Sequence, residues 1–256
     1  MKRFANILAV LAALIPACGT PSGGSASEDD GSSRAQEIVA RADSAAAAVG
    51  SVAYDFTFYG TGELEGLAPF SGSAILEKGP DGGPPLMYVH FLPDTLESGQ
   101  TTPDLTFTTD SETAWMLDVS SRYLVSGLIS EGGEDILQPT ATAAMMEFVI
   151  GGPFQAEMAA DTLRYEGVDT VGGVACDVVY VVYAGGAGRA RWHLGAADAL
   201  PRRVERYDPT GSVSGAQVLE LDAHPGAALA ADQVALVALQ HQLAVCLDEA
   251  EQGRAF

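Results

Sequence analysis

Alternation of large apolar and polar residues along most of the chain predicts an antiparallel sheet. The clearest stretch is 52–59, where the large apolar residues fall on one face: Val52, Tyr54, Phe56 and Phe58. Residues 86–92 carry apolar side chains on both faces of the predicted strand, which predicts a strand covered on both of its faces. The other predicted strands are 71–78, 105–109, 112–119, 122–125, 162–165, 168–171, 174–183, 189–194, 202–208 and 213–222.

Three segments show helical spacing instead. Residues 33–49 are rich in alanine and follow serines that suit a helix N-cap, and Gly50 ends them. Residues 140–150 predict a buried helix because they gather methionines and large apolar side chains. Residues 229–251 return to helical spacing, with apolar side chains at Val234, Val237, Leu239, Leu243 and Leu247.

Runs of antiparallel strands with segregated helices predict an α+β fold. The pattern contains about ten strands in two meanders, and a twisted sheet of that size tends to curl. We therefore expect a single curved antiparallel sheet, an open half-barrel, wrapped over helices. The alanine-rich helix and the methionine-rich middle segment are the expected covers of its concave face.

The N-terminus has the pattern of a bacterial lipoprotein signal. Lys2 and Arg3 precede the uncharged apolar stretch 4–15, which is shorter than the about twenty residues needed to span a bilayer. An aliphatic residue lies three positions before Cys18 and a small residue directly before it. This pattern predicts lipidation of Cys18, with a signal peptide cleaved elsewhere as the alternative.

The domain boundaries follow from that signal. We expect a signal peptide at 1–17, a lipid-anchored cysteine with a polar Gly/Ser-rich tether at 18–33, a folded domain at 34–228 and a helical segment at 229–256. The rest of the chain is interrupted by Gly, Pro or charged residues before it reaches membrane-spanning length. Gly19, in place of aspartate after the cysteine, favours the outer membrane facing the periplasm.

Composition narrows the partners. The chain has 256 residues, 47% of them hydrophobic, so it can bury a core. Its formal net charge of −21 argues against nucleic acid, because phosphate neutralisation needs clustered lysine and arginine. The same charge disfavours adsorption of the folded domain to an anionic membrane surface. Contact with the membrane is therefore expected through the N-terminal lipid alone.

No motif in the chain nominates an enzyme. The sequence lacks a Walker A motif, H-E-x-x-H, C-x-x-C and G-x-S-x-G, and Gly60 to Gly66 misses the dinucleotide fingerprint. Four scattered histidines and three cysteines suggest no metal site, and we expect no cofactor. The function predicted from these residues is non-catalytic.

Two further groups each leave two interpretations open. Cys176 and Cys246 could form a disulfide in an oxidising compartment, or Cys176 could be a buried free thiol. Arg191 and Arg203 could form an anion-binding patch, or they could pair across strands with Glu205 and Asp208.

Three short motifs carry a family resemblance. They are Asp110 to Asp118, an aspartate–turn–hydrophobic hairpin; Leu163 to Asp177, with its glycines and valines before a cysteine; and Arg191 to Leu194 followed by Leu200 to Glu205, a strand pair with leucine–proline–basic–basic. Together with the layout, they resemble the LolA/LolB-like periplasmic lipoprotein-carrier superfamily. Cys18 makes the chain similar to lipidated members, close to a predicted periplasmic family of unknown function.

The resemblance implies a carrier or acceptor that shields an acyl chain, or the lipid moiety of a lipoprotein, between curved sheet and helices. Burial of an acyl chain recovers about 0.8 kcal/mol per CH₂. The candidate lining is apolar and partly adaptable: Phe56, Phe58, Tyr88, Trp115, Leu117, Met145, Met146 and Phe148. The alternative is an envelope scaffold or interaction module in which the same residues form a filled core.

Overall fold

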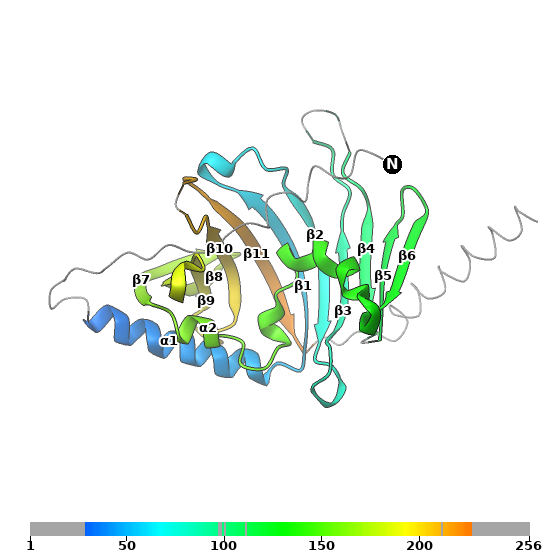
Figure 1. The fold of residues 1–256 in the computed structure, drawn as a ribbon. Coiled ribbons are helices and arrows are strands. Elements are labelled where there is room, and N and C mark those ends of the chain that lie inside the picture. Colours follow the sequence, from blue (N-terminus) through cyan, green and yellow to red (C-terminus); the bar gives the residue numbers. More distant parts are fainter. Residues whose placement is uncertain (1–28, 97–98, 100, 111, 211, 227–256) are drawn as a thin grey trace, which may run out of the picture.

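The structure is a computed structural model that describes residues 29–96, 99, 101–110, 112–210 and 212–226. Its main feature is one curved, open antiparallel sheet of 11 strands, in the order β6-β5-β4-β3-β2-β1-β11-β10-β9-β8-β7 (Figure 1). The strands are β1 Ser51–Gly60, β2 Phe70–Glu77, β3 Leu86–Phe91, β4 Leu105–Thr109, β5 Thr113–Asp118, β6 Tyr123–Leu128, β7 Thr162–Val171, β8 Val174–Val182, β9 Arg189–Gly195, β10 Pro201–Tyr207 and β11 Ala216–Pro225. The predicted α+β class and curved sheet are confirmed.

The sheet consists of two meanders that meet in its middle. Strands β1 to β6 each pair with the next strand along the chain, and so do β7 to β11. The seam between the meanders is the antiparallel pair β1–β11, which runs from Val52 opposite Pro225 to Gly60 opposite Gln217. The first and last strands of the sheet in sequence therefore lie side by side at its centre.

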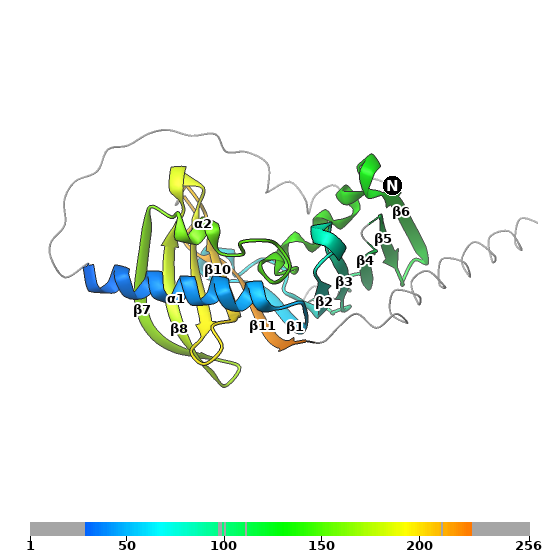
Figure 2. The same ribbon diagram turned by 90° about the horizontal axis from the view of Figure 1, so that it is seen from below.

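Helix α1 (Asp29–Ala48) lies across β7 and β8 on the concave side (Figure 2). It begins four residues earlier than predicted, inside the segment expected to be tether. Its small and branched residues are fully buried on the sheet: Ala35, Ile38, Val39, Ala42 and Ala46. Arg34 and Arg41 lie 4.0 and 3.9 Å from the buried carboxylate of Asp177 on β8, which fixes the helix to the sheet from its polar side.

The middle segment also covers the concave face, but it is not the α-helix predicted over 140–150. It consists of short 3₁₀ turns and one turn of α-helix: η3 Ile129–Glu131, η4 Gly133–Thr142, η5 Met146–Phe148 and α2 Gln155–Met158. Pro139 inside η4 removes a backbone donor, and left-handed Gly132 precedes that turn. These residues explain the 3₁₀ turns before residue 140. Within 140–150, Met145 has a non-helical φ of −81° and ψ of 82°, and its N–H donates to the Tyr54 hydroxyl, so regular α-helical bonding is interrupted there. The remaining 3₁₀ turns are η1 Gly62–Leu64, η2 Pro80–Gly82 and η6 Ala184–Gly186.

Strand β7 joins two segments that the sequence pattern predicts as separate strands. Its pairing with β8 shifts between Tyr165 and Gly167, and Gly167 has a φ of +112°. The extra residue at this bulge shifts the alternation of side chains, so one strand resembles two short ones in sequence.

The core lies between the concave face and its helical covers. Large side chains that are fully buried there include Tyr54, Phe107, Phe148, Phe154 and Trp192. On β3, Met87 and Val89 are buried on the concave side, whereas Leu86 and Tyr88 on the outer side are only partly buried, so the prediction that 86–92 is covered on both sides is met on one side only.

Several predicted features lie outside the described residues. They are the signal peptide, Cys18, most of the tether, Cys246 and the helical segment after 228. Within the described residues, no helix is long and apolar enough to cross a membrane.

Candidate apolar binding site on the concave face

A row of phenylalanines crosses the concave face of β1 to β4. Phe58 stacks on Phe70 with ring centroids 4.5 Å apart and planes 15° from parallel. Phe70 meets Phe91 edge to face at 5.3 Å, and Phe91 meets Phe107 in the same way at 5.7 Å. Phe56 closes the group, with its ring 5.6 Å from Phe91. We call these five residues the phenylalanine row.

The strand register creates this row. Phe58 lies opposite Phe70, whereas Phe56 and Phe91 lie on either side of Gly72. A Cβ at position 72 would come within 2.7 Å of Phe56 Cζ and 1.9 Å of the His90 carbonyl oxygen. Glycine at this position therefore leaves the space that lets Phe56 and Phe91 approach each other.

Tyr54 of β1 is one of the side chains that attach the middle segment to the sheet. The Tyr54 hydroxyl donates to the Ala143 carbonyl at 2.9 Å and accepts from the Met145 N–H at 2.8 Å. The Tyr54 ring also packs against Phe148, with centroids 6.2 Å apart. Burial raises the pKa of Tyr54 well above its usual value, so the hydroxyl stays a neutral donor and acceptor.

Beneath the middle segment the interior is filled, and beyond it the row is partly open. Met145 and Phe148 are fully buried, and Phe56 and Phe58 are nearly so. Phe70 and Phe91, by contrast, are only partly buried at the edge of the core. The open part of this apolar wall lies where the middle segment does not reach.

A small polar group lies in the interior under α2. The Tyr183 hydroxyl donates to Glu157 at 2.6 Å, and the Trp192 indole N–H reaches the Tyr183 oxygen at 3.3 Å. Burial raises the pKa of Glu157, and the hydrogen bond from Tyr183 opposes that rise. Burial likewise raises the pKa of Glu147, with Arg206 as the largest opposing influence.

Among protein families, curated proteins and solved structures, only solved structures are similar to the chain. No protein-family model and no curated protein matches the chain. Among solved structures, LprF from Mycobacterium bovis is similar with a TM-score of 0.51 and 17% sequence identity, over 78% of this chain and 96% of LprF. The chain therefore shares the fold of LprF, a curved antiparallel sheet with helices on one side.

Two more solved structures are similar at lower scores. Lipoprotein LppX from Mycobacterium tuberculosis has a TM-score of 0.43 and 12% identity, over 74% of this chain and 94% of LppX. MucB has a TM-score of 0.46 and 18% identity, over 79% of this chain and 62% of MucB. In the complex of MucB with MucA, the match covers 57% of the compared chain. This chain thus spans less than two thirds of the MucB chains it matches.

The curved sheet separates the eight predicted lining residues onto two faces. Phe56, Phe58, Met145 and Phe148 meet on the concave side, and Met146 packs at the edge of that core. Tyr88, Trp115 and Leu117 do not join them, because Val89 and Met116 occupy the inward positions of β3 and β5. Alternation therefore directs these three side chains to the outer face, and their predicted place in the concave lining is wrong.

The sequence interpretation missed Phe70, Phe91 and the attachment through Tyr54. Met87, Val89 and Phe91 are two residues apart along β3 and face the same side. The sequence alternation could therefore have predicted that Phe91 points to the concave side. Phe70 immediately precedes a predicted strand, and strand ends are the least certain part of such a pattern. The hydrogen bonds of Tyr54 to residues 143 and 145 bridge distant parts of the chain, and the alternation pattern contains no signal for them.

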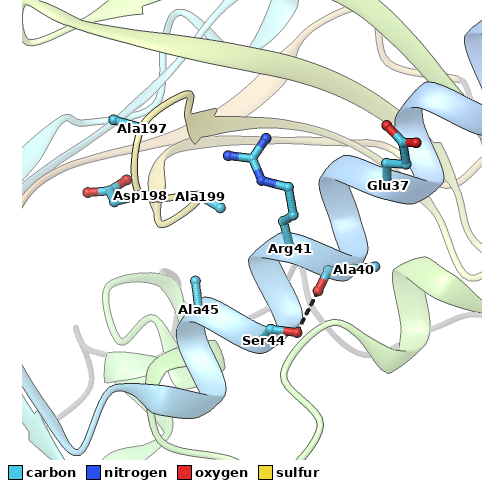
Figure 3. A pocket seen from close by; sticks show the side chains of 8 residues that line it. All are labelled: Glu37, Ala40, Arg41, Ser44, Ala45, Ala197, Asp198 and Ala199. Atoms are coloured by element: carbon cyan, nitrogen blue, oxygen red, sulfur yellow. Dashed lines mark hydrogen bonds between the residues drawn. The ribbon is translucent and has the colours of Figure 1, made fainter.

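Two hollows among the described residues lie away from the phenylalanine row. One of about 550 Å³ lies between α1 and the β9–β10 turn (Figure 3). Its polar groups include Arg41, which donates to the Ala196 carbonyl at 3.0 Å, and Asp198, which accepts from Arg202 at 2.5 Å. These groups already have partners, so the hollow is a junction between helix and turn. The second, of about 250 Å³, lies on the outer face beside Tyr88 and His224.

The arginines predicted as an anion patch are engaged by carboxylates. Arg191 reaches Glu166 at 2.6 Å and Glu205 at 2.8 Å. Arg203 reaches Glu220 at 2.8 Å and Asp169 at 3.6 Å. The cross-strand alternative is thus confirmed for Arg191 and Glu205. Asp208 instead accepts hydrogen bonds from its own turn, including those from Thr210 and Ser212.

The remaining predictions concern cysteines and metals. Cys176 is fully buried and has no disulfide partner among the described residues, and its thiol contacts the Val174 carbonyl at 3.4 Å. Cys246 lies outside the described residues, so its pairing stays a prediction. Within the described part of the chain, no cluster of three histidine, cysteine or acidic side chains could hold a metal ion.

Proposed function

We propose that the protein is a non-catalytic carrier or acceptor that binds an acyl chain, or the lipid moiety of a lipoprotein, on its concave face. The observation that carries this proposal is the phenylalanine row, whose members Phe70 and Phe91 are only partly buried on a curved sheet like that of LprF. Flat aromatic side chains offer a wide apolar contact at low entropic cost. Each CH₂ of an acyl chain laid on this wall would contribute about 0.8 kcal/mol when fully buried.

The middle segment would adapt to the ligand. It is made of short 3₁₀ turns with poorer hydrogen-bond geometry than an α-helix, and it carries Met145 and Met146 over the sheet. Its side chains fill the interior in the described structure, so a longer chain would have to displace them. A bound chain would thus extend from the open part of the row towards the space that Met145 and Phe148 occupy.

The filled interior favours a second candidate. Because Met145 and Phe148 are fully buried, the domain could also be an envelope interaction or scaffold module that holds no ligand. The two candidates differ in one measurable property, which is uptake of an apolar chain.

Native mass spectrometry of the mature chain tests the proposal. We expect a bound mass of lipid size that organic extraction removes and added palmitate restores. The double variant Phe70→Ala/Phe91→Ala should lose this uptake, and Phe70→Trp, which keeps an aromatic wall but narrows it, should reduce uptake while the protein stays folded. Tyr123→Ala is the matched control, because Tyr123 is 60% exposed on the edge strand β6. If the purified protein carries no bound mass and takes up no palmitate, the carrier proposal is wrong and the interaction module is favoured.

We further propose that Cys18 anchors the protein in the outer membrane facing the periplasm, with 1–17 as the signal peptide and 18–28 as the anchored tether before α1. Support comes from the sequence of this segment, since Cys18 follows a short apolar stretch and precedes Gly19. Metabolic labelling with a palmitate analogue should mark the wild type and not Cys18→Ser. Fractionation should place the labelled chain with outer-membrane markers. Label that survives in Cys18→Ser would contradict the anchor.

A further inference from the structure

The outer face of the sheet has two chemically different halves. Over β7 to β11 it carries charged side chains that neutralise one another across strands. Arg191 bridges Glu166 and Glu205, Arg203 reaches Glu220 at 2.8 Å, and the Tyr59 hydroxyl donates to Glu220 at 2.5 Å. The charged side chains named here therefore pair with one another across strands.

The other half, over β2 to β6, carries larger apolar side chains among small polar ones. Its large outward apolar side chains are Ile75, Tyr88, Trp115, Leu117 and Leu124, with Thr106 and Thr108 of β4 between them, and we call this surface the outer apolar face. Leu92 and Val119, which continue the same alternations beyond β3 and β5, are each 45% exposed. Its one ion pair among the described residues of these strands and their connections joins His90 to Asp104 at 2.8 Å. Partly exposed aromatic and aliphatic side chains gathered on one face are typical of an interaction site.

The chain leaves the sheet at the border of the two halves. Strand β11 lies between β10 and β1, and the N–H of Gly226 donates to the Ser51 carbonyl at 2.8 Å. His224 lies opposite Ala53, which in turn is opposite Ile75 and next to the outer hollow of about 250 Å³. The residues that follow Gly226 therefore start within reach of the outer apolar face.

The segment beyond this exit has the length and the pattern to cover that face. Leu236, Leu239, Leu243 and Leu247 recur at intervals of three or four, which places them on one side of a helix. As a helix, 229–251 would be about 34 Å long at 1.5 Å per residue. The six strand-to-strand steps from β11 to β6 measure about 29 Å at 4.8 Å each. Helix α1 already crosses strands in this way on the concave side (Figure 2).

We propose that the C-terminal segment 229–251 docks through its leucine side on the outer apolar face of this same chain. The docked segment covers Tyr88, Trp115 and Leu117 and leaves the phenylalanine row on the concave side open. It also supplies the second cover that the doubly apolar pattern of 86–92 requires. The proposal is independent of whether the concave face binds a lipid.

A cysteine cross-link tests the position of the segment in the full mature chain with Cys18→Ser. Cys246 lies about 26 Å along a helix that starts at 229, which places it over β5 or β6. Ser126→Cys introduces an exposed thiol on β6 directly opposite Trp115, whereas Thr170→Cys introduces an exposed thiol on β7 at the far edge of the sheet. We expect a short bismaleimide to join Cys246 to position 126 within one chain and not to position 170. The proposal is wrong if Cys246 is joined to neither position. It is also wrong if Cys246 is joined only to a second chain, and in that case another copy of the protein occupies the face.

Tryptophan fluorescence provides a second readout. Trp192 is 1% exposed, so collisional quenching reports Trp115, which lies on the outer face. Leu239→Asp/Leu243→Asp should raise quenching because it releases the segment. The control Ala238→Asp/Gln242→Asp adds the same charge on the opposite side of the helix and should leave quenching unchanged. Equal quenching in the wild type and both double variants, with unchanged circular dichroism of the folded sheet, contradicts docking. The outer apolar face would then be a surface for a separate partner.

Discussion

Tyr54 on β1 holds Met145 of the middle segment through a hydrogen bond of 2.8 Å from the Met145 backbone N–H to the tyrosine hydroxyl. The same hydroxyl donates to Ala143 at 2.9 Å, so a single side chain satisfies two backbone groups of a segment that has little regular structure. Two backbone groups of the segment therefore depend on one oxygen atom, while Glu157 and Thr140 make further contacts with Tyr183 and Met87.

Replacement of Tyr54 by phenylalanine should lower the free energy of unfolding by about 1–3 kcal/mol, because a buried carbonyl and a buried N–H lose their partner. Urea denaturation measures this loss. Proteolysis within 143–150 should also become faster, since the segment is released from the sheet. Tyr123→Phe on the exposed edge strand is the control and should change neither quantity. A stability equal to that of the wild type would show that the hydroxyl does not hold the segment.

Replacement of Gly72 by alanine should destabilise the phenylalanine row. The new Cβ would lie 1.9 Å from the His90 carbonyl oxygen and 2.7 Å from Phe56 Cζ, so strand β2 and the Phe56 ring must both move. Overpacking of this kind costs about 1–3 kcal/mol. Gly66→Ala is the matched control, because nothing lies within 4 Å of a Cβ at that position. Denaturation midpoints of the two variants should differ, and equal midpoints would disprove the close approach.

Glu205 and Glu157 should change the stability in opposite directions on the two sides of pH 4.5. Burial alone would raise the pKa of Glu205, but its hydrogen bonds, including those from His193 and Arg191, lower it to about 2. The unfolded chain therefore binds more protons between about 2 and 4.5, and stability is lost as the pH falls through this range. Glu157 is the opposite case, because burial raises its pKa above 4.5. There the folded chain binds more protons, so stability falls as the pH rises above 4.5.

Two isosteric variants separate these effects in a pH series of urea denaturations. Glu205→Gln should flatten the acid side of the profile, and Glu157→Gln should flatten the side above pH 4.5. Each variant serves as the control for the other. If both retained the wild-type profile on both sides, neither carboxyl would govern the pH dependence.

Replacement of Asp177 by asparagine should loosen α1 from the sheet. The buried carboxylate accepts a hydrogen bond from Tyr165 at 3.3 Å and lies within 4.0 Å of Arg34 and Arg41. We expect a loss of about 1–3 kcal/mol and faster amide hydrogen exchange across α1, because a charged acceptor is replaced by a neutral one. The exposed Asp161→Asn should leave exchange in α1 unchanged. Unchanged exchange in Asp177→Asn would show that apolar packing alone holds the helix.

Local patterns were sufficient to predict the sheet, because each strand alternates within a few residues and each hairpin has its own turn. Residues 52–59 show this well, with Val52, Tyr54, Phe56 and Phe58 buried as expected. The alanine-rich helix was predictable for the same reason. The bulge at Gly167 and the 3₁₀ turns around Pro139 were not, since both break the regular periods on which such predictions depend.

The candidate site was predicted only in part, because the strand register decides which side chains face the concave side. The apolar character of Tyr88, Trp115 and Leu117 is the same as that of true lining residues, and only the pairing of β3 and β5 with their neighbours decides which way they face. The same register brings Phe58 and Phe70 into contact across β1 and β2. The attachment of Met145 to Tyr54 depends on the tertiary path of the chain, which no short pattern contains.

The seam between β1 and β11 determines when the molecule can finish folding. Every other strand pair joins neighbours in sequence and can form as soon as the second strand exists, but Val52 must wait for Pro225. Long-range pairs of this kind raise contact order and slow the closing step. Until β11 has been synthesised, the described strands can pair only within their own meander, and β1 lacks the partner that it has at the seam.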